Sequence, residues 1–330
     1  MKPAAIFLGC IASSVLLVAC FKGDKPVVLP APGDAKEYSV SMGSDYATEI
    51  YFHLSDGSSV STAFDQWDLC MEASITGYHI WMNGGNNEYI ANTHQTDFSA
   101  TPDTTSLTFN YDAPDFNADS TAIGEYLVSG ASTPSKKEVY IMKRGYQSDL
   151  SLRFKKFVIV SANDANYLIR YANLDGSFED SLLVTKNPQY AFAYFTFDNG
   201  GQQLHFEPPV NSWDILFTRY RYVFTTLIPP LPYEVNGVLL NPGTAVARDT
   251  TKNFNDIDLA FAQTLTYSQR RDAIGYNWKF FDFASQTYLT KTYYNYIIKD
   301  LAGVYWKMHF IDFYNGQGQK GYPKFELKRL

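Results

Sequence analysis

The segment NSWDILFTRYRY, residues 211–222, contains a Trp-Asp pair followed by a run of aliphatic and aromatic residues. Such residues favour strands, because branched and planar side chains pack well on a pleated surface. A related segment, DQWDLCMEA, occupies residues 65–73 and is centred on Trp67 and Asp68. Two Trp-Asp-aliphatic strands this far apart in one chain indicate a structural unit that is used twice.

Further landmarks recur in the same order and at nearly constant separation. The pairs are Tyr46 and Tyr190, Ile123-Gly124 and Ile274-Gly275, residues 140–143 and 296–299, residues 154–157 and 306–310, and residues 166–169 and 321–325. Chance explains one such pair easily, but it explains an ordered series poorly. We therefore predict two tandem copies, residues 38–176 and 180–330, joined near Asp175-Gly176-Ser177. The alternative is one large β domain that reuses similar strand sequences.

Composition supports a chain built from strands. Aromatic residues make up 16% of the 330 residues, with 25 Tyr and 24 Phe, and helical periodicity is weak throughout. Residues 99–119 are polar and acidic and predict a long irregular loop, and residues 255–263 are the best candidate for one short helix. The predicted fold class is all-β and antiparallel with little helix. A net charge of -7 excludes nucleic acid as a partner, since few phosphates could be neutralised.

The first residues have the layout of a secretory signal peptide. A basic start at Lys2 is followed by an apolar run, too short to span a bilayer, over residues 4–19. It ends in Leu17-Val18-Ala19-Cys20, which resembles a bacterial lipobox. We therefore predict a signal peptide over residues 1–19, acylation of Cys20, and a flexible tether that continues to residue 37. The alternative is an ordinary signal peptide with a chance cysteine.

The second half contains the most recognisable segments. In order these are WDILFTRY (213–220), YEVNGV (233–238), IGYNWK (274–279), YIIKD (296–300), GVYWKMHF (303–310) and KGYP (320–323). This series resembles the HmuY-like family of surface lipoproteins from Bacteroidota, over residues 180–330 directly and over the first half through the repeat. The resemblance implies an all-β fold, a lipid anchor in the outer membrane facing the surface of a Gram-negative cell, and no catalysis. It also implies binding of haem that is taken from a host carrier and passed to an outer-membrane receptor.

Haem iron takes axial ligands from His, Met, Cys or Tyr. The segment GYHIWMNGG places His79 and Met82 beside a glycine-rich turn, and His94 follows in a polar loop. These three are the strongest local group of candidate ligands. Met308 and His309 are adjacent candidates, but successive side chains of a strand point to opposite faces, so both cannot face one iron from an unbulged strand.

No other chemistry is indicated. The chain has no nucleophile elbow, phosphate loop, paired Cys-x-x-Cys or His-Glu-x-x-His motif, and residues 253–258 lack the glycine and distal Glu of a calcium loop. We expect neither an enzyme nor a separate metal site, and we interpret Cys70 as a buried apolar residue. The alternative function is a glycan- or protein-binding adhesion module. We expect Trp67 and Trp213 to anchor equivalent cores, and Asp68 and Asp214 to face outward or to bond to a neighbouring turn.

Overall fold

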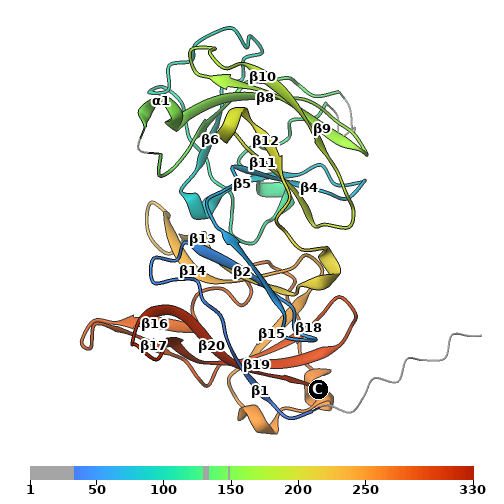
Figure 1. Cartoon of the computed structure of the whole chain (residues 1–330), viewed down its shortest axis with the longest axis vertical. Helices are drawn as coiled ribbons and strands as arrows, with labels where there is room; N and C mark the ends of the chain where they lie inside the picture. The colour runs from blue at the N-terminus through green and yellow to red at the C-terminus, as the bar shows by residue number, and fades with distance from the viewer. Residues whose placement is uncertain (1–32, 129–133, 148) are drawn as a thin grey trace, which may run out of the picture. The chain divides into compact units, whose positions relative to one another are not determined.

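The computed structural model describes residues 33–128, 134–147 and 149–330 (Figure 1). The predicted signal peptide, the acylated Cys20 and the tether up to residue 32 lie outside the described residues. The described residues form antiparallel sheets, as predicted for an all-β chain. No helix among them is long and apolar enough to cross a membrane.

One pair of sheets forms what we call the central lobe, residues 69–204. Its five-stranded sheet has the order β10-β9-β8-β7-β6, and its four-stranded sheet has the order β12-β11-β4-β5. The bounds are β4 Leu69–Glu72, β5 Ile80–Met82, β6 Tyr89–Asn92, β7 Tyr140–Lys143, β8 Phe154–Ala162, β9 Asn166–Asn173, β10 Asp180–Thr185, β11 Phe192–Thr196 and β12 Gln202–Leu204. The lobe is therefore continuous in sequence.

The other pair of sheets forms the terminal lobe, which combines residues 36–63 with residues 215–329. Its five-stranded sheet has the order β1-β20-β19-β18-β15 and its four-stranded sheet the order β14-β13-β2-β3. The bounds are β1 Lys36–Ser39, β2 Thr48–Phe52, β3 Ser59–Ala63, β13 Ile215–Phe224, β14 Leu231–Leu240, β15 Ala245–Asp249, β18 Asn295–Lys299, β19 Tyr305–Tyr314 and β20 Lys320–Arg329. A separate hairpin joins β16 (Lys279–Asp282) to β17 (Thr287–Thr290).

The two lobes have the same topology, and their first three strands are exchanged between the sequence copies. β1, β2 and β3 begin the first copy but pair within the terminal lobe, whereas β10, β11 and β12 begin the second copy but pair within the central lobe. β2 pairs with β13, and β11 pairs with β4. The sheets therefore do not divide the chain at the predicted joint, residues 175–177. That joint stays a prediction about where one sequence copy ends and the next begins.

The Trp-Asp pairs make the same contacts in both lobes. The backbone N of Asp68 donates to Phe195, and that of Asp214 donates to Phe52, both at 2.9 Å. Beyond each pair, an Asn side chain donates to the Trp carbonyl oxygen: Asn83 to Trp67 at 3.0 Å and Asn241 to Trp213 at 2.7 Å. Each Trp also packs edge-on against a Tyr of the exchanged strand, Tyr194 or Tyr51. This shared geometry supports the interpretation of two related units.

The side chains of Asp68 and Asp214 do not face outward, so the first of our two expectations for them is wrong. Both are buried, and each side chain accepts a hydrogen bond from the backbone just after the exchanged strand. Asp68 accepts from the backbone N of Phe197, and Asp214 accepts from that of Leu54, both at 2.7 Å. Asp68 additionally forms a buried ion pair with Arg144, whose Nε lies 2.6 Å from it. The alternative expectation was a bond to a neighbouring turn, and it agrees with these contacts, since Leu54 lies in a turn and Phe197 begins one.

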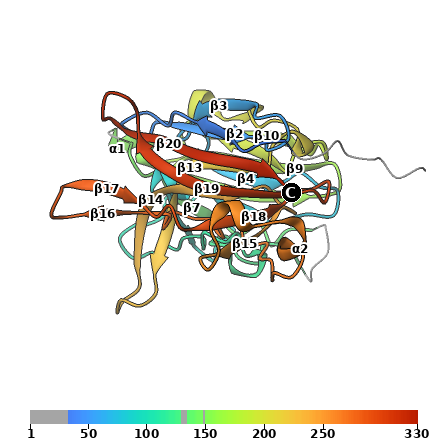
Figure 2. The same ribbon diagram turned by 90° about the horizontal axis from the view of Figure 1, so that it is seen from below.

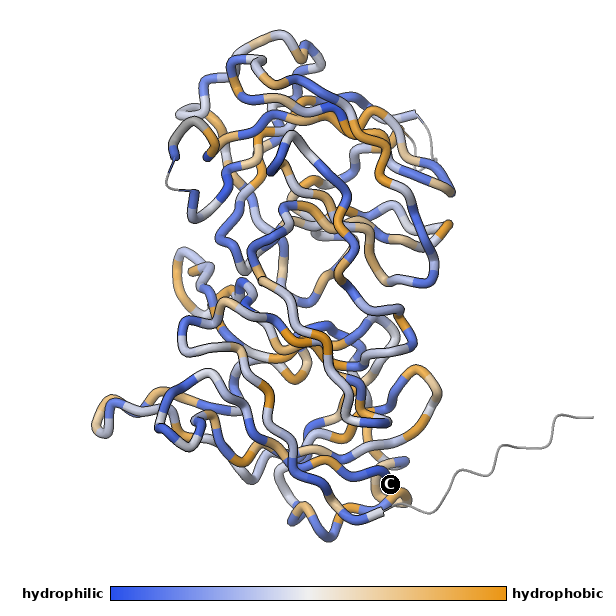
Figure 3. Tube along the Cα trace, in the orientation of Figure 1, coloured by the Kyte–Doolittle hydropathy of each residue, from blue (hydrophilic) through white to orange (hydrophobic). Residues whose placement is uncertain are grey.

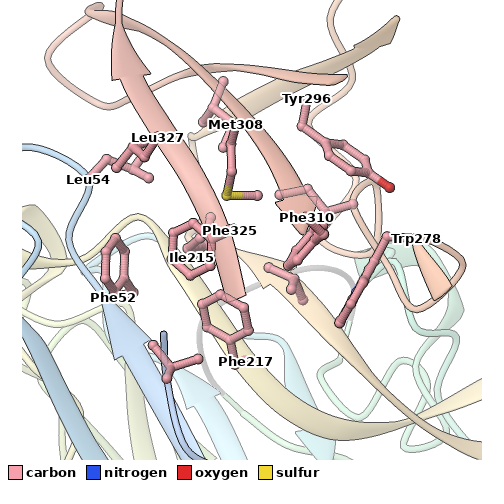
Figure 4. Close-up of a cluster of buried hydrophobic side chains, with 14 of the residues drawn as sticks. Phe52, Leu54, Ile215, Phe217, Trp278, Tyr296, Met308, Phe310, Phe325 and Leu327 are labelled. Atoms are coloured by element: carbon pink, nitrogen blue, oxygen red, sulfur yellow. The ribbon is translucent and has the colours of Figure 1, made fainter. Parts of the chain in front are cut away.

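Each lobe has its own apolar core between its two sheets. In the terminal lobe, Phe52 and Ile215 from the four-stranded sheet meet Met308, Phe310 and Phe325 from the five-stranded sheet (Figure 4). The central lobe has an equivalent core. The four-stranded sheets of the two lobes face each other in the middle of the stack (Figure 1). Alternation along β2 explains this, since Ile50 and Phe52 enter the core while Glu49 and Tyr51 face the other lobe.

Helix content is low, as predicted. The α-helices are α1 Leu150–Arg153 and α2 Leu259–Ala262, and the 3-10 turns are Gly84–Asn86, Ala118–Ser120, Asp198–Gly200, Val210–Ser212 and Phe254–Asp256. The single helix expected over residues 255–263 is split in two. Ile257 and Asp258 are extended, and the Asp258 side chain instead caps the start of α2 by accepting from Phe261. Residues 99–119 contain no named strand, in agreement with the predicted loop.

Candidate functional site

Met308 and His309 point to opposite faces of β19, as their adjacent positions predict. Met308 lies at the centre of the terminal-lobe core (Figure 4). His309 stacks on Phe254 with 4.2 Å between ring centroids. Its Nδ1 lies 3.1 Å from the Thr292 carbonyl oxygen, and its Nε2 lies 2.8 Å from a Glu326 carboxylate oxygen. Both ring nitrogens are therefore hydrogen-bonded, which leaves none for a ligand in this arrangement.

Met82 and His94 have unlike surroundings. Met82 is buried in the central-lobe core, and its sulfur lies 4.0 Å from a guanidinium nitrogen of Arg221. The side chain of His94 is 76% exposed, and its Nδ1 lies 3.4 Å from a Glu138 carboxylate oxygen. The structure therefore does not place these two candidates in one cleft. As candidate ligands both stay predictions.

His79 is the candidate whose geometry suits a ligand best. Its Nδ1 lies 2.7 Å from Oε2 of Glu72, which also accepts from the His79 backbone N at 3.0 Å. Because an ionised carboxylate only accepts, Nδ1 carries the hydrogen, and Nε2 of the neutral ring then carries a lone pair. A carboxylate on the opposite nitrogen is the usual way in which proteins orient a metal-binding His. The side chain is 44% exposed and lies 5.9 Å from the Trp81 ring.

An open groove of about 460 Å³ adjoins His79. Glu72 and Trp81, the two contacts of His79, line this groove, while His79 itself lines a smaller hollow of about 240 Å³. Ala118 lines both spaces, so the hollow that His79 lines is adjacent to the groove. The groove falls within the range of about 300–1,000 Å³ that is usual for small-molecule sites.

Aromatic rings form the floor of the groove. Trp81 stacks on Phe116 with 5.1 Å between centroids, and Phe192 lies 5.9 Å from each of them. The guanidinium of Arg271 lies 4.2 Å from the Phe116 ring and 4.8 Å from the Phe192 ring. Tyr190 completes the aromatic part of the lining. Trp81, Phe192 and Arg271 are themselves buried, so the lining combines apolar rings with one cation that already packs on two of them. Rings and a cation are the groups that would recognise a planar ligand with a carboxylate.

The sequence made His79 a candidate ligand, which it stays, but did not indicate the residues that surround it. Glu72 reaches His79 because β4 pairs with β5, and Phe116 reaches Trp81 because the long loop folds back over this sheet. Arg271 comes from the terminal lobe and Phe192 from an exchanged strand. The repeated Trp-Asp strands could have suggested that the two halves meet here, but no local motif marks these side chains.

A second space between the lobes is too small for an organic ligand. It measures about 50 Å³ and is lined by Glu49, Asp112 and Arg271 among others, room for a few water molecules at most. Burial raises the pKa of Glu49 to about 8 and that of Asp112 to about 6. One oxygen of Glu49 has no hydrogen-bond partner within the described part of the chain.

The residues at the groove fit haem in part. His79, which lies beside the groove and does not line it, has a ring nitrogen that could ligate iron, while the groove itself is lined by aromatic rings and by Arg271. Among the described residues, no second axial His or Met lines the groove or the adjoining hollow. Within the described part of the chain, no cluster of three His, Cys, Asp or Glu side chains could hold a metal ion by itself.

A family model described as HmuY protein matches residues 45–327. The chain belongs to the HmuY family. This match confirms the resemblance found in the sequence. The HmuY family is a family of haem-binding type. None of the curated proteins compared with the chain matches it.

Solved structures with similarity to this HmuY family member include two apo proteins. Apo PinO from Porphyromonas gingivitis has a TM-score of 0.32 and 12% identity, covering 90% of this chain and 99% of its own. The apo HmuY analog of Tannerella forsythia has a TM-score of 0.33 and 8% identity, covering 91% and 98%. A putative HmuY-like heme binding protein from Bacteroides vulgatus has a TM-score of 0.22 and 16% identity, covering 38% and 78%.

Proposed function

We propose that this HmuY family member is a surface lipoprotein that binds haem, or a related planar hydrophobic ligand, in the groove beside His79. The observation that carries the proposal is the state of the His79 ring. Its Nδ1 is held by Glu72, its Nε2 has no hydrogen-bond partner among the described residues, and its neighbour Trp81 lines the aromatic groove. His79 would supply an axial nitrogen, and Arg271 would neutralise a ligand carboxylate.

The cellular part of the proposal rests on the sequence. Acylation of Cys20 would anchor the protein in the outer membrane, and the tether would hold the folded part at the surface. A haem-binding protein in this position would take its ligand from a host carrier and pass it to an outer-membrane receptor. If a Cys20→Ala variant still separates with the membrane fraction, the proposed anchor is wrong.

Hemin titration followed in the Soret region tests the binding proposal. The chain from residue 21 onward is suitable, because residues 33–330 form one compact unit that keeps every described strand. We expect a shifted Soret band that saturates at one hemin per chain. His79→Ala should weaken binding about ten-fold or more, which corresponds to about 1.4 kcal/mol.

His94→Ala is the matched control, since His94 is also exposed and paired with a glutamate. It should leave the titration unchanged. A free-hemin spectrum with the wild-type chain would contradict haem binding altogether. An equal loss in both variants would contradict the specific role of His79.

The second candidate function is a glycan- or protein-binding adhesion module. Polar groups at the rim of the same groove, from Glu72, Ser74, Asp115 and Gln269, could hydrogen-bond to hydroxyl groups while Tyr190 stacks on a sugar face. Binding on a glycan array that is lost in Tyr190→Ala, together with no response to hemin, would favour this function.

A further inference from the structure

The hairpin that joins β13 to β14 ends in an exposed apolar tip. No charged residue lies between Arg221 and Glu234, and the turn reads Thr225-Thr226-Leu227-Ile228-Pro229-Pro230. Ile228 is 99% exposed, and Leu227 and Leu231 are about half exposed. The hairpin projects away from the sheets beside the β14 label in Figure 2, and its end is coloured hydrophobic in Figure 3.

Aromatic side chains form a collar behind this tip. Tyr222 packs against Phe224 and Tyr276 at 5.1 and 4.9 Å between centroids, and Tyr233 lies 6.1 Å from Phe224. Along the hairpin itself, charged residues begin only beyond the collar, with the buried Arg221 and the ion pair of Arg219 with Glu234. Along the hairpin the order is therefore apolar tip, aromatic collar and charged base.

This order matches the polarity profile of a bilayer interface. Aromatic residues prefer the headgroup level, aliphatic residues prefer the acyl region below it, and charged residues stay in water. A narrow convex tip suits a fluid apolar phase better than a rigid partner, because protein hot spots fill preformed pockets and have a polar rim. Only the hydroxyls of Thr225 and Thr226 offer side-chain hydrogen bonds among residues 223–232.

We propose that the tip, residues 224–231, inserts into the interfacial region of a lipid bilayer, with Leu227, Ile228 and Leu231 below the headgroups. The inference goes beyond ligand binding, and it uses the proposed function in one respect. The anchor at Cys20 would keep the tip close to a membrane, so that a weak intrinsic affinity is enough. Insertion would fix how the lobes are oriented toward the surface.

Vesicle partitioning without the anchor tests the proposal. The chain from residue 21 onward is mixed with neutral vesicles of phosphatidylcholine and phosphatidylethanolamine and then sedimented. Removing two aliphatic side chains in the double variant Leu227→Ser, Ile228→Ser should lower the partition coefficient about ten-fold or more. Phe283→Ser is the matched control, because Phe283 is exposed to a similar degree on the other hairpin. It should bind as the parent does.

Fluorescence locates the tip in the same samples. Ile228→Trp should give an added emission that brominated acyl chains quench, whereas the emission added by Phe283→Trp should not be quenched. Equal partitioning of parent and double variant, or an unquenched signal from the Ile228→Trp variant, would overturn the proposal. A third result would also overturn it: if the Ile228→Trp emission shifts with protein concentration in the absence of lipid, the tip contacts a second copy of the chain and not a bilayer. Neither measurement uses hemin or acylation, so the result is independent of the proposed function.

Discussion

Glu49 is a carboxyl group that folding moves from water into the space between the lobes. Thr218 donates to one oxygen at 2.9 Å, while the other is buried without a partner among the described residues. The net effect raises its pKa from 4.5 to about 8: burial is the main cause, the Thr218 hydrogen bond and Arg271 oppose the rise, and Glu207 adds to it. Because the folded pKa lies above the unfolded pKa, the folded state binds more protons between these values. This group therefore makes the protein less stable as pH rises from 4.5 to 8.

We predict that Glu49→Gln flattens the pH dependence of the unfolding free energy. Ionisation of Glu49 contributes a loss of up to about 1.4 kcal/mol per pH unit in this window, and the amide removes it. Urea unfolding of both proteins at about pH 5 and about pH 8 measures the difference between their slopes. The variant should gain stability relative to wild type at the higher pH. An identical slope in the two proteins would show that Glu49 is solvated.

At the residue scale, the sequence predicted His79 but not what makes it useful. Its neighbours in the chain indicate a strand beside a flexible turn, and the turn is indeed there. Glu72, Phe116 and Arg271 come close only through strand pairing, loop folding and lobe contact, which are long-range events. The same limit explains Met308, whose sequence position says nothing about its place in a closed core.

At the element scale, the two Trp-Asp strands share backbone geometry but differ in charge balance. Asp68 is paired with Arg144, which also contacts Asp198 at 2.8 Å. Asp214 accepts from the Leu54 backbone and forms no ion pair within the described part of the chain, and burial raises its pKa to about 6. The negative charge of Asp68 is therefore needed to balance Arg144, whereas the charge of Asp214 balances no cation and is unfavourable.

We predict unequal effects of the same substitution at these positions. Asp68→Asn leaves Arg144 with a weakened partner in a buried site and should lower the unfolding free energy by about 3 kcal/mol. Asp214→Asn keeps an acceptor for Leu54 and removes an unfavourable charge, so its effect at neutral pH should stay within about 1 kcal/mol. Denaturant unfolding of the two variants measures both. Equal destabilisation would mean that the loss of stability comes from the shared backbone contacts and not from the difference in charge.

Element prediction succeeded where alternation is strong and failed where short turns compete. Residues 47–54, 138–144 and 152–160 are rich in strand-forming residues, and each range contains a strand or most of one, namely β2, β7 and β8. The helix expected over residues 255–263 is interrupted, because Asp258 caps a new turn with its side chain instead of continuing the old one. The tether was expected to reach residue 37, yet Lys36 already pairs with Leu327 in β1.

At the scale of the whole molecule, the sequence order of the copies differs from the order of packing. Each lobe combines the first three strands of one sequence copy with the remaining strands of the other copy. The exchange cannot be predicted from the sequence, because a strand has the same alternation of apolar and polar residues in either lobe. Sequence comparison can therefore detect the repeat but cannot assign its strands to lobes.

Two fragments of similar length make this point testable. Residues 64–208 contain both sheets of the central lobe complete, whereas residues 180–330 lack β1, β2 and β3 and carry β10, β11 and β12 without their partners. We predict a cooperative unfolding transition by circular dichroism for the first fragment and none for the second. A folded 180–330 fragment would contradict the exchanged arrangement.

The central claim is that His79 provides the ligand nitrogen at the groove, and imidazole rescue tests it most directly. His79→Gly removes the ring and leaves space that free imidazole can enter. Hemin should bind His79→Gly about ten-fold or more weakly and without the wild-type Soret band position. Added imidazole should restore that band position, while His94→Gly shows it without imidazole. A wild-type hemin spectrum of His79→Gly in the absence of imidazole would contradict the account.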